Sequence, residues 1–108
     1  MRRRRAALLA ATAALVVAVA VPAAGAGRSV RLGDNFFTPR SLTVSANTTV
    51  TWTWRTQAPH NVVGSGPARF SSGGPETSGR YRRRLTRRGT YRIVCALHPD
   101  MRMTLRVR

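Results

Sequence analysis

The chain contains no lysine, three acidic residues and a single cysteine among its 108 residues. One cysteine excludes a disulfide within the chain, although small exported domains often depend on such bridges. The three carboxylates are Asp34, Glu76 and Asp100, and they face 19 arginines, so the formal charge is +16. No segment shows helical periodicity of normal length, an internal repeat or heptads, which excludes a helical bundle or a coiled coil.

The first 26 residues differ in composition from the rest. Residues 2–5 are all arginine, residues 6–27 are uncharged and rich in Ala, Val and Leu, and the stretch ends in Ala24-Gly25-Ala26. This order is typical of a secretory signal peptide cleaved after Ala26, and the paired arginines also allow twin-arginine export. An uncleaved anchor is the alternative, since ~20 apolar residues span a bilayer; Pro22 and the small-residue ending favour cleavage.

We therefore expect a leader over residues 1–26 and one domain over residues 27–108. Four of the 19 arginines lie in the leader, so 15 remain in the domain against three acidic residues, a formal charge of +12. Such a surface favours acidic partners, membranes or polyanions and says nothing about fold. A nucleic-acid role is disfavoured because no recognition motif accompanies the charge.

Short alternating segments dominate the domain. Apolar and threonine positions alternate strictly over residues 49–54, and similar alternation marks segments 30–32, 42–44, 81–85, 90–95 and 103–107. Turn residues separate them, and residues 64–80 are expected to be a loop. Six or seven short strands predict an all-β sandwich or barrel. Arg83 is anomalous, because alternation points it inward with Tyr81 and Leu85.

The stretch Val-Cys-Ala-Leu-His-Pro-Asp-Met at residues 94–101 gathers three potential metal ligands in one tight turn. The other histidine, His60, follows the strand at 49–54. Together, His60, Cys95, His98 and Met101 form the ligand set of a blue copper site: a thiolate, two imidazoles and a weak thioether. Zinc is the alternative ion, but methionine is not among its usual ligands.

These motifs resemble the small plastocyanin- or amicyanin-like cupredoxins. The resemblance extends from about residue 30 to residue 108 and includes FTPRSLTV (37–44), VTWTW (50–54), APHNVV (58–63), GTYRIVC (89–95) and CALHPDM (95–101). It implies a Greek-key β-sandwich holding one type 1 copper ion. The arginine content and Trp54-Arg55 depart from the usual family pattern without touching a proposed ligand.

The resemblance also implies a role for each residue. His60, Cys95 and His98 match the strong ligands, and Met101 matches the axial ligand of a short loop. Other members place the methionine five positions after the second histidine, here Met103, but Met103 falls on the core face with Leu105 and Val107. Asn61 matches a residue that does not bind metal and whose side chain joins the two ligand-bearing segments.

The resulting hypothesis is an exported one-electron carrier, periplasmic, extracellular or held at the cell envelope, and not an enzyme. It would be monomeric, would meet acidic redox proteins and would bind no nucleic acid. With two histidines, the chain lacks the further histidine pairs of a multicopper oxidase. Two alternatives stay open: copper delivery or storage without electron transfer, and a polyanion- or envelope-binding module that uses the arginine surface.

Overall fold

A computed structural model describes residues 12–15 and 27–108 of the chain. The predicted leader therefore lies outside the described residues, apart from positions 12–15. Within the described part, no helix is long and apolar enough to cross a membrane.

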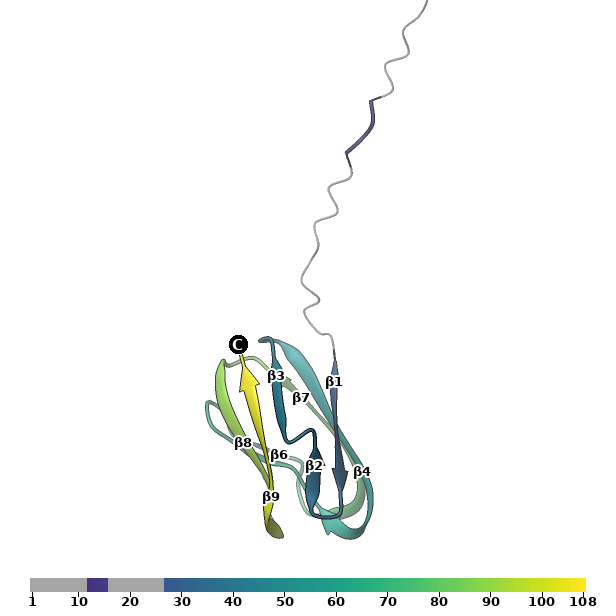
Figure 1. Cartoon of the computed structure of the whole chain (residues 1–108), viewed down its shortest axis with the longest axis vertical. Helices are drawn as coiled ribbons and strands as arrows, with labels where there is room; N and C mark the ends of the chain where they lie inside the picture. The colour runs from purple at the N-terminus through teal and green to yellow at the C-terminus, as the bar shows by residue number, and fades with distance from the viewer. Residues whose placement is uncertain (1–11, 16–26) are drawn as a thin grey trace, which may run out of the picture.

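Residues 28–107 form two β-sheets that pack face to face (Figure 1). The four-stranded sheet has the order β2 (Phe36–Thr38), β1 (Arg28–Gly33), β4 (Thr48–His60) and β7 (Glu76–Leu85). The five-stranded sheet has the order β3 (Ser41–Val44), β9 (His98–Val107), β8 (Gly89–Cys95), β5 (Val63–Ser65) and β6 (Phe70–Ser71). The chain crosses between the sheets after β2, at the cis peptide Thr38–Pro39. The predicted all-β sandwich is confirmed for these residues.

The core lies between the sheets because alternate side chains of each strand point inward. On β4, Val50, Trp52 and Trp54 are buried while Thr53 is exposed. On β8, which belongs to the other sheet, Tyr91 and Ile93 are buried in the same core cluster. Alternation therefore identified the core face of the main strands correctly.

Residues 64–80 are not one loop, contrary to the prediction. The structure places β5, β6 and the start of β7 there. Strands of two or three residues between Gly, Ser and Pro leave too few alternating positions to be recognised. The predicted strands at 49–54 and 103–107 are also longer: β4 continues to His60, and β9 begins at His98.

Arg83 lies on the inward side of β7, as its position predicts, and it is half-buried. Its guanidinium carbon lies 5.5 Å from the ring centroid of Phe70, which belongs to β6 at the edge of the other sheet. A cation over an aromatic face is attracted by the ring quadrupole. Arg83 therefore covers the edge of the sandwich between β7 and β6. There its aliphatic part packs against the protein, and its guanidinium group stays in contact with solvent.

The two ends of the sandwich differ in what they hold. One end carries the start of β1, since Arg28 pairs with Val50, and also the chain's last residue, since the Arg108 N–H donates to the carbonyl of Val44. The opposite end carries the turn between β8 and β9 and the end of β4 (Figure 1). The candidate ligands lie at this second end.

Candidate metal centre

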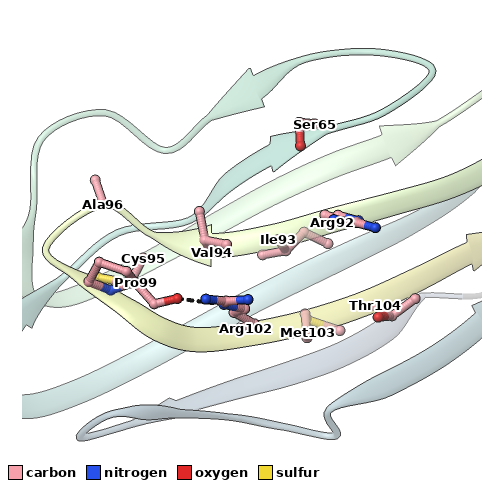
Figure 2. A pocket seen from close by; sticks show the side chains of 10 residues that line it. All are labelled: Ser65, Arg92, Ile93, Val94, Cys95, Ala96, Pro99, Arg102, Met103 and Thr104. Carbon is pink, nitrogen blue, oxygen red and sulfur yellow. Dashed lines mark hydrogen bonds between the residues drawn. The ribbon is translucent and has the colours of Figure 1, made fainter.

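Cys95 is the last residue of β8, and His98 is the first residue of β9. The two residues pair across the turn, directly after an irregularity in the β8–β9 register. The turn is braced from β9, where Arg102 Nε donates to the carbonyl of Pro99 over 2.6 Å (Figure 2). Cys95 is buried and His98 is half-buried, so the turn directs one side chain inward and leaves the other near solvent.

His60 reaches the same point from the other sheet. It ends β4, after an irregular stretch between Arg55 and His60, and its side chain is fully buried. Its Nδ1 lies 3.7 Å from the Cys95 Sγ, while His98 Nδ1 lies 3.5 Å from the same sulfur. The two imidazole centroids are 4.7 Å apart.

The donor atoms of His60, Cys95 and His98 all lie within 4.8 Å of one another. One thiol proton cannot serve two imidazole nitrogens at once, whereas a single cation satisfies all three donors. Bonds of about 2.0 Å to nitrogen and about 2.3 Å to sulfur require nitrogen–sulfur separations of the order observed here. The residues therefore fit a metal ion.

Met101 is buried on the inner face of β9, 1% exposed. Met103, Leu105 and Val107 are buried on the same face. Alternation therefore does not separate the two methionines, although the sequence argument used it for that purpose. Register does distinguish them, because Met103 pairs with Ile93, further from the turn, while Met101 falls in the irregular stretch beside Cys95.

Asn61 joins the two segments that carry these residues. Its Oδ1 accepts the Ala96 N–H at 2.8 Å, and its Nδ2 donates to the carbonyl of Gly73 at 3.0 Å. The Asn61 side chain is buried, and both hydrogen bonds are partly buried. This contact fixes the turn after Cys95 to the segment that follows His60.

Asp34 lies in the turn between β1 and β2 and was not among the predicted site residues. Its Oδ1 lies 3.1 Å from His60 Nε2, and its carboxylate also accepts the backbone N–H groups of Ala58 (3.1 Å) and Gln57 (3.3 Å). The Ala58 N–H, followed by His60 and the Gln57 N–H, holds the pKa of Asp34 below its ordinary value of 3.8. No local motif announces this contact, because it joins segments 26 positions apart.

A pocket of about 580 Å³ lies beside the Cys95 turn (Figure 2). Arg92 and Arg102 border it, together with Ala96 and Pro99. Both arginines are exposed, and the Arg102 guanidinium lies 3.9 Å from the Asp100 carboxylate, a surface pair of small energetic weight. The surface next to the cysteine is therefore basic.

Comparison with known protein families agrees with the resemblance found in the sequence. The family model of copper binding proteins, plastocyanin/azurin family, matches residues 26–108. No curated protein sequence matches the chain significantly.

Three solved structures show similar folds. A purple cupredoxin from Nitrosopumilus maritimus is 23% identical over 75% of this chain and 99% of its own, with a TM-score of 0.67. An oxidised amicyanin variant is 26% identical over 82% of this chain and 88% of its own, also with a TM-score of 0.67. A copper-containing nitrite reductase from Thermus scotoductus SA-01 is 26% identical over 76% of this chain but only 22% of its own, with a TM-score of 0.65.

Proposed function

Because the chain belongs to the plastocyanin/azurin family of copper-binding proteins, we propose that it is a type 1 copper protein that carries single electrons. Its copper ligands are His60, Cys95, His98 and Met101. The observation that carries this proposal is the convergence of both histidines and the only cysteine on one point. A thiolate with two imidazoles and a thioether suits copper better than zinc.

The chain's own residues suit electron transfer. When bound, copper would supply the one-electron couple, and it would be held by the Cys95 thiolate, the two imidazoles and the weak thioether donor of Met101. The turn that holds Cys95 is tied down by Asn61, which keeps the ligands in place between oxidation states. His60 is fully buried, whereas His98 is half-buried beside the exposed Leu97. The electron therefore leaves through His98.

The proposal includes no enzymatic activity. Two histidines do not supply a second copper centre beside the first. The match to the nitrite reductase covers less than a quarter of that protein, so its activity is not carried over to this chain.

We propose export and the domain division together. The leader is residues 1–26 and the domain is residues 27–108, a monomer working in the periplasm, outside the cell or at its envelope. The first strand begins at Arg28, just after the expected cleavage point, which supports the division. An uncleaved leader would hold the same domain at the membrane.

The redox partner is an acidic protein. Arg92 and Arg102 border the pocket beside Cys95 (Figure 2), so carboxylates of a partner would find opposite charge next to the metal centre. Arg80, Arg82 and Arg84 add exposed charge on the outer face of β7.

Copper titration tests the central proposal. One equivalent of Cu(II) added to the metal-free domain should give an intense thiolate-to-copper band in the orange-red part of the spectrum. Cys95→Ser should abolish this band, because the charge-transfer donor is lost. Voltammetry of the loaded protein should show fast, reversible one-electron transfer.

Two outcomes would contradict the proposal. A colourless complex with an ordinary tetragonal Cu(II) signal would exclude the type 1 site. A blue complex with very slow electron exchange and tight Cu(I) binding would indicate copper delivery or storage instead.

A further inference from the structure

Asp34 makes its three side-chain contacts with one short segment, the end of β4 that carries His60. It is one of three acidic residues in the chain, and among the described residues no arginine forms a hydrogen bond or an ion pair with it. In a domain with so many guanidinium groups, a carboxylate would ordinarily pair with an arginine. This carboxylate binds an imidazole and two backbone N–H groups instead, which indicates that the fold sets its position.

The fold explains how Asp34 arrives there. β1 runs parallel to β4, with Leu32 opposite Trp54, so the chain leaving β1 lies beside the last residues of β4. The following Asn35 has φ of 73°, the left-handed conformation that asparagine tolerates in tight turns. The β4–β7 register is irregular between Arg55 and His60. The N–H groups of Gln57 and Ala58 lie within this stretch, and the Asp34 carboxylate accepts both.

The contact with His60 determines which nitrogen carries the proton. An ionised carboxylate only accepts hydrogen bonds, so His60 Nε2 must donate to Asp34 Oδ1. The neutral imidazole then has an unprotonated Nδ1, which is the atom 3.7 Å from Cys95 Sγ. The His60 ring is fully buried, whereas the Asp34 side chain is 43% exposed, so the carboxylate reaches the ring from the solvent side.

We propose that Asp34 is a positioning residue of the metal centre, which holds His60 in the Nε2–H tautomer and makes its Nδ1 a stronger donor. This inference rests on the proposed function and adds a residue to its site. A carboxylate bonded to a ligating imidazole raises the basicity of that ligand. Its negative charge also favours the more highly charged oxidised ion over the reduced one. Asp34 therefore lowers the reduction potential of the centre.

The first measurement needs no metal. In the metal-free protein, the ¹⁵N shifts of the His60 ring should report the Nε2–H tautomer. Asp34→Ala should give a mixture of tautomers. Asp34→Asn should lie between the two, because its Oδ1 still accepts but its charge is lost.

The second measurement uses copper. Asp34→Ala should weaken Cu(II) binding by about 10- to 100-fold and Cu(I) binding by less. Each tenfold difference between the two losses raises the potential by about 59 mV for a one-electron couple. Asp34→Asn should raise the potential by a smaller amount and keep the blue band.

Glu76→Gln is the matched control. It removes the same charge from the residue opposite His60 on β7, so it should leave the tautomer unchanged and shift the potential less than Asp34→Asn. An unaltered tautomer in Asp34→Ala, or equal shifts in the Asp34→Asn and Glu76→Gln variants, would overturn the proposal. If wild-type protein failed to form a blue site, the function would be wrong, and the metal-free tautomers would still decide the role of Asp34.

Discussion

Met101 and Met103 are neighbouring side chains on the inner face of β9, yet we assign them different roles. Met101 lies in the irregular stretch next to Cys95, whereas Met103 pairs with Ile93 in the regular ladder. Both are buried, so burial alone is no guide to the ligand.

Substitution by leucine should separate the two methionines. Met101→Leu should keep a copper site but raise its potential or change its spectrum, because the weak axial donor is lost. Met103→Leu, the control, should leave the spectrum unchanged and cost less than about 1.5 kcal/mol of unfolding free energy, as a volume-conserving core change. Visible spectra, voltammetry and urea unfolding measure these effects. Exchanged effects would identify Met103 as the ligand.

At the scale of elements, the metal centre joins three segments: the end of β4, the turn after β1 and the turn between β8 and β9. Asn61 provides the direct hydrogen bond between the first and the last of these. The centre is therefore held together partly by side chains that bind no metal.

Asn61→Ala should weaken this junction. It leaves the Ala96 N–H and the Gly73 carbonyl without their partner, so we expect a loss of about 1–3 kcal/mol of unfolding free energy. Urea unfolding of the metal-free protein measures this loss. Gln57→Ala is the control, since its exposed side chain should contribute less than about 0.5 kcal/mol. Equal stability of the two variants would show that the Asn61 bonds contribute nothing in the absence of metal.

The sequence predicts an element well when the pattern that marks it lies within a few neighbouring residues. Alternation identified β1, β4, β8 and β9, because each has several apolar residues on one face. It ended β4 at Trp54, where the strict alternation stops, and it began β9 at Met103, because the residues from Cys95 to Met101 were interpreted as a turn. Cys95, His98 and Met101 were proposed as ligands because they lie in one close motif, and His60 was added as the chain's other histidine. The family match confirms the resemblance to copper-binding proteins, and the ligand assignment stays a prediction.

Asp34 illustrates what sequence patterns leave out. Its contact with His60 depends on the parallel pairing of β1 with β4, which no local pattern specifies. The place of Arg83 was also unexplained until β6 was seen to bring Phe70 to the edge of the facing sheet. Both side chains are polar groups whose partners come from another strand.

At the scale of the whole molecule, the charge is nearly all of one sign. The domain carries 15 of the chain's 19 arginines and all three acidic residues. Two of these carboxylates are paired in the structure, Asp34 with His60 and Asp100 with Arg102. The surface field is therefore strongly positive and should act on encounter rates with acidic proteins.

The salt dependence of electron transfer tests this field. The second-order rate with an acidic electron donor should fall steeply between low and physiological ionic strength, where the Debye length shrinks to about 8 Å. Arg80→Glu combined with Arg82→Glu should weaken that dependence and leave the blue spectrum intact. The corresponding glutamine pair should have about half the effect, because it changes half as much charge.

Arg83 is kept in these variants because it packs on Phe70. Stopped-flow rates insensitive both to salt and to these substitutions would show that the arginines serve another purpose, such as adhesion to the cell envelope.

The arrangement of the two ends of the sandwich also decides how this protein can be attached to a solid support. Arg28 and Arg108 both lie at the end away from the Cys95 turn. A linker joined to either position would fix the domain with His98 facing outward. On an electrode, this orientation would leave the proposed electron exit free for a soluble partner and place the body of the sandwich between the copper and the electrode. Direct exchange with the electrode would then be slow unless the linker were moved to the turns beside β8 and β9.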